Sequence, residues 1–195
     1  MQPTNLKEID KIMIFYVSDM HLGRNHPLLL RGFATIEEMT NTLITNWNNK
    51  VLPTDTVYII GDIADNHHDD IEQYISVLNG KKHLIVGNQD RTWFTAMPED
   101  KKRKLFKSIS FYNEIYDNDR LVVLCHYPLM DWLHSKKGAY MIHGHTHAAK
   151  TMPYWNMMKI TQNLLNAGVD VNHLTPCTLD ELIVNNKLFK ESGDA

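Results

Sequence analysis

Five short apolar runs in this 195-residue sequence are each followed within two residues by an aspartate, asparagine or histidine. The runs span 12–17, 56–60, 83–86, 121–125 and 140–142. Each has the length of a β-strand, and most lack a polar alternation, which is typical of strands buried on both faces. A sixth run of this kind spans 164–167. The chain should therefore fold around buried strands whose ends carry polar side chains.

Helical patterns lie between the early runs. Thr35 and Glu38 form the pattern of a capping box, followed by a helix-period stripe of Ile36, Met39, Leu43 and Trp47. Asp69 or Asp70 should cap a second helix that stops at Gly80 and carries four apolar residues on one face, namely Ile71, Tyr74, Ile75 and Leu78. A third should open at Pro98, with Leu105, Phe106 and Ile109 as its apolar side. Strands that alternate with helices indicate an α/β class. After residue 140 the pattern predicts hairpin-like strands without a clear helix.

Composition excludes several classes of protein. No linker or repeat divides the chain, so we expect one domain over 1–195. A net charge of -3 gives no long-range attraction for nucleic acid or anionic membranes, and neither is an expected partner. Cys125 and Cys177 lack the spacing of a disulfide framework. No apolar run approaches the roughly 18 residues of a membrane span, and residues 1–11 lack a secretory core, so we expect a cytoplasmic protein. The oligomeric state stays open.

The side chains after the strands have the chemistry of metal ligands. Ligands bind beyond the carboxyl ends of strands in open α/β sheets, so five strand ends should point into one crevice. Residues i and i+2 of an extended chain share a face, which would pair Asp19 with His21 and His145 with His147. Oxygen and imidazole donors without thiolate suit Mn, Fe, Zn, Ni or Co. Glycines beside these positions would allow sharp turns or close approach of the backbone: Gly61, Gly87 and Gly144.

The ordered series of motifs resembles the calcineurin-like metallophosphoesterases. Their pattern is D-x-H, G-D-x-x-D, G-N-H-D, a lone His and G-H-x-H. Here it reads Asp19-Met20-His21, Gly61-Asp62-Ile63-Ala64-Asp65, Gly87-Asn88-Gln89-Asp90, His126 and Gly144-His145-Thr146-His147. The segments 33–48 and 166–170 also look like the small stand-alone prokaryotic and phage members, so the resemblance covers nearly the whole chain.

The resemblance implies a four-layer α/β/β/α sandwich of two mixed sheets flanked by helices. It also implies two divalent ions, Mn²⁺ being the expected metal and Fe, Zn, Ni or Co the alternatives. One ion would be held by Asp19, His21, Asp62 and His147, and the other by Asp62, Asn88, His126 and His145. The implied activity is hydrolysis of phosphate esters by a hydroxide held between the two ions.

Gln89 stands where the family has its catalytic histidine, which Asp90 would normally orient. Glutamine can donate a hydrogen bond but cannot deliver a proton near neutral pH. Three explanations stay open: an engineered replacement that slows turnover, a natural variant for diesters or good leaving groups, or a decayed enzyme that only binds. A nearby histidine could replace the acid, the candidates being His26, His67 and His68.

The expected substrate is a small phosphodiester or a nucleotide-like molecule. Candidate substrate contacts are Arg24, Asn25, Arg31 and His67, and arginine matches phosphate geometry bidentately. Asp65 is followed by Asn66-His67 instead of the Arg-Gly of phosphoprotein phosphatases, which disfavours phosphoprotein substrates. The alternative function is a non-catalytic binding or scaffold protein on the same fold, which keeps its metals for structure.

Overall fold

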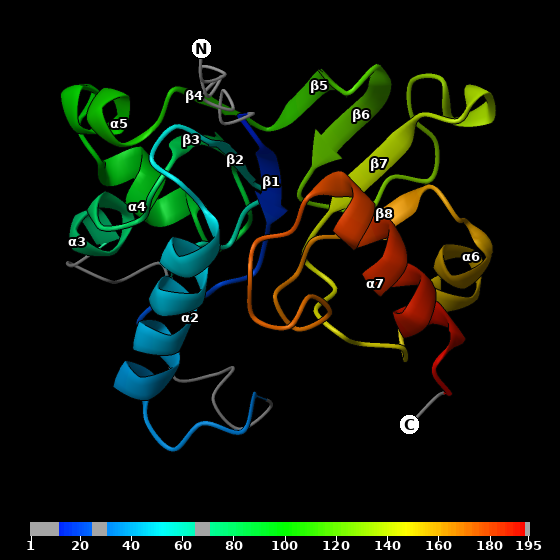
Figure 1. Ribbon diagram of the computed structural model, residues 1–195, viewed down its shortest axis with the longest axis horizontal. Helices are drawn as coiled ribbons and strands as arrows, with labels where there is room; N and C mark the ends of the chain where they lie inside the picture. The colour runs from blue at the N-terminus through cyan, green and yellow to red at the C-terminus, as the bar shows by residue number, and fades with distance from the viewer. Residues whose placement is uncertain (1–11, 25–30, 65–70, 194–195) are drawn as a thin grey trace, which may run out of the picture.

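The computed structural model describes residues 12–24, 31–64 and 71–193, and its strands form two four-stranded sheets (Figure 1). The first sheet has the order β1-β2-β3-β4 and the second has the order β5-β6-β7-β8. This confirms the expected α/β class with two sheets and flanking helices. The predictions made for Asn25, His26, Asp65, His67, His68, Asp69 and Asp70 concern residues outside the described ranges.

The first sheet is parallel throughout its described strands, rather than mixed. β1 (Ile14–Val17), β2 (Thr56–Ile59), β3 (Lys81–Ile85) and β4 (Ser108–Ser110) pair side by side in sequence order. Their connections carry α2 (Ile36–Lys50), α3 (Ile71–Ser76), α4 (Arg91–Ala96) and α5 (Glu99–Leu105). Parallel strands need such crossovers, and the helices cover the sheet's outer face.

Three local predictions in this sheet need correction. The Thr35 hydroxyl caps α2 by accepting from the Glu38 N–H, but the Glu38 carboxylate accepts from Ala34 N–H rather than closing a capping box with Thr35. The predicted second helix ends at Ser76, before Leu78. The helix that begins after Pro98 ends at Leu105, and Ile109 lies in β4, because β4 pairs with β3 there.

The second sheet is mixed. β5 (Tyr112–Asp117) and β6 (Arg120–Cys125) form an antiparallel hairpin, whereas β7 (Tyr140–His143) and β8 (Leu164–Asn166) are parallel to their neighbours. The expected hairpins after residue 140 are therefore wrong. The connections hold a short 3₁₀ turn (Ser135–Lys137) and α6 (Trp155–Ile160), and α7 (Leu179–Glu191) follows β8. A capping box of Thr178 and Glu181 begins α7.

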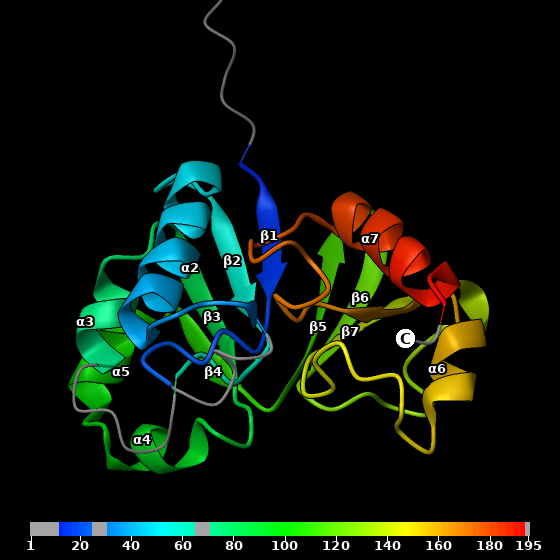
Figure 2. The same cartoon turned by 90° about the horizontal axis from the view of Figure 1, so that it is seen from below.

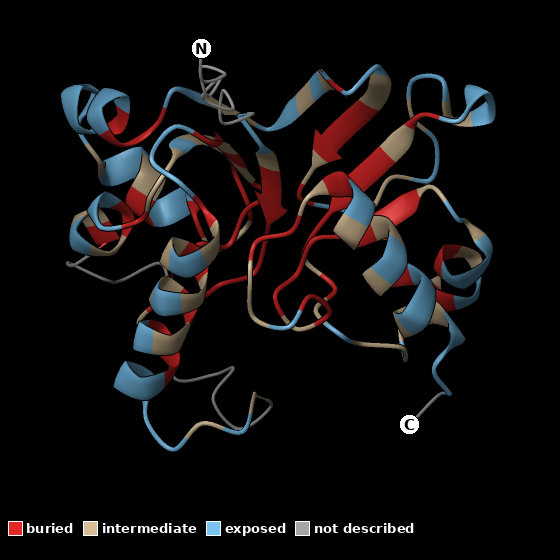
Figure 3. Cartoon of the chain, in the orientation of Figure 1, coloured by how far each residue is buried: buried red, intermediate tan, exposed pale blue. Residues whose placement is uncertain are grey.

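Three apolar clusters fill the interfaces between the layers. Figure 2 shows these layers, and Figure 3 colours the buried residues red. The outer face of the first sheet packs on α2, with Val57 and Ile59 near Leu43 and Trp47. The two sheets enclose the middle cluster, which includes Tyr16, Ile85, Val122, Leu124 and Ile142. The third cluster joins the second sheet to α6 through Met141 and Trp155. Within the described residues, every helix is too short or too polar to cross a bilayer.

β1 lies where the two sheets meet. Tyr16 forms an antiparallel bridge with Cys177, and Ser18 forms a parallel bridge with Gly168. The segment after β8 is therefore held against the end of the first strand by backbone hydrogen bonds, such as Ser18 N–H to Ala167 C=O at 2.9 Å. This contact brings the carboxyl ends of strands from both sheets to one place.

Candidate metal centre

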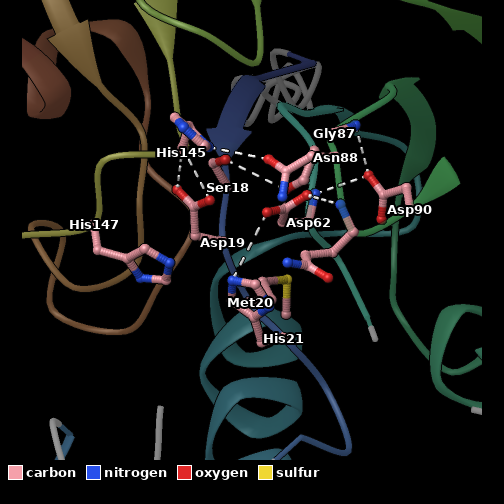
Figure 4. Close-up of polar contacts among 12 residues, drawn as sticks. Ser18, Asp19, Met20, His21, Asp62, Gly87, Asn88, Asp90, His145 and His147 are labelled. Atoms are coloured by element: carbon pink, nitrogen blue, oxygen red, sulfur yellow. Dashed lines mark hydrogen bonds and ion pairs between the residues drawn. The ribbon is translucent and has the colours of Figure 1, made fainter. Parts of the chain in front are cut away.

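The seven side chains expected as metal ligands come together from five strand ends, and Figure 4 labels all of them except His126. Two sets of three residues each bring their ligand atoms within 4.8 Å of one another. One set is Asp19, His21 and His147, and the other is Asp19, Asp62 and His126. The first set matches three of the four ligands expected for one ion. Asp19, rather than Asp62, is common to both sets. The bridging role of Asp62 remains a prediction, although its Oδ2 lies 4.0 Å from His21 Nε2 and 3.5 Å from His126 Nε2.

Five of these seven residues have a left-handed backbone conformation. The φ angles range from 48° to 68° for Asp19, His21, Asp62, His145 and His147. Residues with a Cβ rarely adopt this conformation, and each one costs about 1–3 kcal/mol. The pairs Asp19/His21 and His145/His147 therefore do share a face, but through sharp turns after the strands and not through an extended chain. Strain of this kind is concentrated at functional sites.

The glycines beside the ligands permit the close approach that the sequence predicted. A Cβ on Gly61 would lie 2.7 Å from the Gly87 Cα, so the second and third ligand loops touch at these two residues. A Cβ on Gly144 would overlap the Ser18 hydroxyl and lie 2.8 Å from Asp19 Oδ2. Larger residues at either place would push the ligand loops apart.

Backbone N–H groups hold both carboxylates expected to bind metal. Both oxygens of Asp19 lie 3.0 Å from the His145 N–H, and Asp62 Oδ1 accepts from the Gln89 N–H at 2.8 Å. Burial raises the pKa of Asp19 to about 6, since a carboxylate loses solvation there. A cation next to Asp19 would offset that cost.

Asp90 positions the loops and does not face the cavity. It is 0% exposed, and its carboxylate accepts from the backbone N–H groups of Asp62, Ile63 and Gly87 at 2.8–3.1 Å. The Trp93 indole also donates to it at 3.3 Å. These contacts tie the loop after β2 to the loop after β3. The expected catalytic role of Asp90 is thus limited to orienting the residues around it.

Asn88 and two histidines form the other side of the cage. The amide Oδ1 of Asn88 lies 2.9 Å from His126 Nε2 and 3.0 Å from His145 Nδ1. His126 Nδ1 donates to the Ile60 carbonyl at 2.8 Å, which leaves Nε2 directed at the centre. Burial lowers the pKa of His126, but the hydrogen bond to Asp62 and the charge of Asp19 raise it to about 9. Metal binding at this ring would require its neutral form and would release the proton.

His21 gives the clearest test of whether the residues fit a metal. Its side chain is buried with the residue 4% exposed, yet neither ring nitrogen has a hydrogen-bond partner among the described residues. Burial lowers its pKa to about 3, so the ring is neutral and presents a lone pair. Buried polar atoms are almost always paired, and a neutral imidazole is a common metal ligand. The cage therefore fits a cation.

A partly buried ion pair behind His147 was not identified by the sequence analysis. Asp170 Oδ2 accepts from His147 Nδ1 at 2.7 Å, and Asp170 Oδ1 accepts from Arg31 Nε at 2.7 Å. This fixes the His147 ring with Nε2 toward the cage, the usual arrangement behind a metal-bound histidine. The signal was present in the tail 166–170, which resembles the family.

Arg31 was expected to contact substrate, and in the structure its guanidinium has protein partners instead. Its side chain is 2% exposed, and it donates to Asp170, to the Met20 carbonyl at 2.9 Å and to the Asp19 carbonyl at 2.6 Å. All of these partners are protein groups, so the guanidinium holds the first ligand loop against Asp170.

A cavity of about 280 Å³ opens onto the cage. Arg24 and Gln89 line it together with His21, Asp62, Asn88, His145 and His147. Of the four residues expected to contact substrate, Arg24 is thus at the cavity, Arg31 is not, and Asn25 and His67 lie outside the described ranges.

Two facing sheets with outer helices, and a cage of carboxylate, amide and imidazole groups at their strand ends, are the arrangement that the sequence resemblance to the calcineurin-like metallophosphoesterases implied. The uncharacterised protein MJ1445 of Methanocaldococcus jannaschii is 30% identical over 190 residues, which cover 93% of this chain and 97% of that protein. The chain therefore belongs to the family of this archaeal protein. No model of a known protein family matches.

Two further proteins are similar to this chain over most of its length. The Gene 66 protein of Mycobacterium phage L5 is 26% identical over 187 residues, covering 80% of this chain and 86% of the phage protein. A solved structure of AQ665 from Aquifex aeolicus, a protein of unknown function, has a TM-score of 0.67 and 24% identity over 87% of this chain and 97% of that one. The latter likeness shows a shared fold.

Proposed function

We propose that the protein hydrolyses phosphate esters with two divalent metal ions, and that small phosphodiesters or nucleotide-like molecules are its substrates. The observation that carries this proposal is His21, whose two buried ring nitrogens have no hydrogen-bond partner among the described residues and lie beside Asp19, Asp62 and His147. A metal ion satisfies such a ring, and the neighbouring carboxylates balance the ion's charge.

Each half of the cage would hold one ion. Asp19, His21, Asp62 and His147 are the ligands proposed for the first, and Asp62, Asn88, His126 and His145 those proposed for the second. When bound, such ions neutralise phosphoryl oxygens and lower the pKa of a water molecule. Mn²⁺ is the metal we expect.

Two polar side chains of the protein would bind the oxygens of the phosphate ester during the reaction. Arg24 lines the cage cavity and would donate hydrogen bonds to a phosphoryl oxygen. Gln89 lines the same cavity, and its side-chain amide would donate to the leaving oxygen without delivering a proton. Leaving groups that depart as stable anions should therefore react best.

Hydrolysis of bis-p-nitrophenyl phosphate tests the proposal. We expect the protein to release nitrophenol with Mn²⁺ and to stop when a chelator removes the metal. His21→Asn should abolish the reaction and lower the number of bound ions, measured by elemental analysis. His134→Asn is a matched control, because His134 is an exposed histidine with a similar φ of 57°.

Two results would overturn the proposed enzymatic function. If Mn²⁺ binds but no nitrophenol is released above background, also after Gln89→His, the alternative of a non-catalytic metal-binding scaffold is favoured. If no metal binds at all, both functions fail.

A further inference from the structure

A second and larger cavity lies against the cage on the side of His147. Its volume is about 670 Å³, and two loops form it: the segment 145–152 after β7 and the segment 169–174 after β8. These loops follow neighbouring strands of the second sheet (Figure 1). The cavity has the size of a pocket for a small organic ligand, for which about 300–1,000 Å³ is typical.

The two cavities share a wall. His145 and His147 line both the cage cavity and the larger cavity. In Figure 4, His147 stands at the edge of the cage away from Gly87 and Asp90. The cage cavity, at about 280 Å³, suits a phosphoryl group. A substituent attached to that group would reach the larger cavity by passing these two histidines.

The lining of the larger cavity is mainly apolar. Its apolar residues are Ala148, Ala149, Met152, Val169, Val171 and Leu174. The two charged residues at the wall, Arg31 and Asp170, neutralise each other at 2.7 Å. They also use their remaining groups on His147 and on backbone carbonyls. The cavity therefore offers apolar contacts to a ligand, and its Arg31–Asp170 pair does not require a charged group on that ligand.

Two side chains favour a flat aromatic ligand over an aliphatic one. The Met152 thioether makes favourable contacts with ring edges. His173 is exposed, has a φ of 55° and lines the cavity, where its imidazole offers a second flat surface.

We propose that this cavity binds an aromatic substituent of the phosphate ester while the phosphoryl group lies at the cage. The inference rests on the proposed function, because it assumes that the cage binds the phosphoryl group. It narrows the substrate class to esters that carry a ring system and disfavours small hydrophilic esters such as phosphoserine.

A pair of phosphonates tests the proposal without turnover, since their carbon–phosphorus bond is not hydrolysed. Naphthalene-1-phosphonate and methylphosphonate both present a phosphoryl group, and only the first carries rings. With the Mn²⁺-loaded protein, we expect the naphthalene compound to bind at least about tenfold more tightly in calorimetry, from the burial of its rings. It should also inhibit hydrolysis of bis-p-nitrophenyl phosphate more strongly by a similar factor.

Two variants place this preference in the larger cavity. Ala149→Phe should fill the cavity and remove the preference for the naphthalene compound, and leave methylphosphonate binding unchanged. Met152→Ala should weaken the preference without adding bulk, which keeps the test informative if the first variant does not fold. Ala96→Phe is the matched control, because Ala96 is an exposed alanine at the end of α4.

The outcomes separate the two proposals. Equal binding of both phosphonates, or a preference unchanged by Ala149→Phe and Met152→Ala, overturns the aromatic site and leaves the proposed hydrolysis standing. Failure of both phosphonates to bind a metal-loaded protein that still hydrolyses bis-p-nitrophenyl phosphate overturns the aromatic site alone, and the same failure without hydrolysis overturns both proposals. A preference that the variants remove, in a protein without hydrolysis, supports the aromatic site and overturns the proposed enzyme.

Discussion

The two halves of the chain contribute different chemistry to the cage. The first half, residues 12–110, supplies Asp19, His21, Asp62 and Asn88, which include every oxygen donor expected to bind metal. The second half, residues 111–193, supplies only imidazoles: His126, His145 and His147. The first half folds as a parallel sheet with crossover helices, and the second as a mixed sheet that begins with a hairpin.

Each half orients the ligands of the other. Asp19 of the first half is held by the His145 N–H of the second, and His126 of the second donates to the Ile60 carbonyl of the first. His147 is fixed by Asp170, which Arg31 of the first half holds in turn. The cage is therefore a property of the joint between the sheets, and neither half would present its ligands correctly alone.

The largest expected effect is the loss of Mn²⁺ affinity on removing the negative charge of Asp62, which lies between the two halves. Asp62→Asn keeps the side chain's shape but removes the carboxylate that lies between His21 and His126. Loss of Mn²⁺ affinity should exceed the about 10–100-fold typical of changes behind a ligand. Calorimetric titration measures it. Asp119→Asn is the control, being an exposed aspartate with a φ of 64°, and an equal loss there would contradict the special role of Asp62.

The next largest effect concerns proton delivery to the leaving group by the residue at position 89, which belongs to the first half. Gln89→His should raise the rate by about 10²–10⁴ for esters with alkoxide leaving groups, because histidine can deliver a proton. The gain for p-nitrophenyl esters should be small, since that leaving group needs little protonation. The ratio of kcat/KM for the two esters measures this difference. An equal gain for both, or a similar gain from Gln162→His at an exposed position, would contradict the role of position 89.

A smaller effect probes the ion pair that joins the halves. Asp170→Asn should weaken Mn²⁺ binding by about 10–100-fold, because His147 loses the carboxylate that orients its ring. Asp180→Asn removes an aspartate from an exposed ion pair with Arg120 and should leave Mn²⁺ binding unchanged. If Asp170→Asn also leaves Mn²⁺ binding unchanged, the ion pair does not support the cage.

The smallest effect lies far from the joint, in the outer layer of the second half. Lys190 donates to the Thr161 and Leu164 carbonyls, and burial lowers its pKa from 10.5 to about 8. Between these values the unfolded chain binds more protons than the folded protein, so stability rises with pH. Relative to Lys190→Met, the wild type should gain about 1 kcal/mol between pH 7 and pH 9.

Urea unfolding at the two pH values measures the Lys190 effect. The exposed Lys187→Met on the same helix is the control for losing a charge. A pH dependence that is identical in wild type and Lys190→Met would show that Lys190 does not cause it. A dependence that changes with Mn²⁺ would place its origin at the cage.

The sequence predicted best where ligands follow buried strands. Asp19, Asp62, Asn88, His126 and the pair His145/His147 each follow a short apolar run, and that order survives in the structure because parallel strands bring their carboxyl ends to one edge. The close approach at Gly87 was also foreseeable, since only glycine fits against the neighbouring loop.

Contacts between distant segments were not predictable in the same way. Arg31 follows the first ligands like a substrate contact, and only the fold shows that Asp170 neutralises it from 139 residues away. Three helices were missed. α4 and α6 have six residues each and no side-chain cap. α7 was missed although Thr178 and Glu181 form the Thr-x-x-Glu pattern of a capping box.

The long separation of the cage contacts along the chain bears on the rates of folding and unfolding. Asp19 and His145 are 126 residues apart, and Arg31 and Asp170 are 139 apart. Contacts between such distant residues close large loops, so they should form after the transition state for folding. Interactions that are absent from the transition state change the unfolding rate and leave the folding rate unaltered. Metal bound at this cage would therefore lengthen the lifetime of the folded protein without helping it to fold faster.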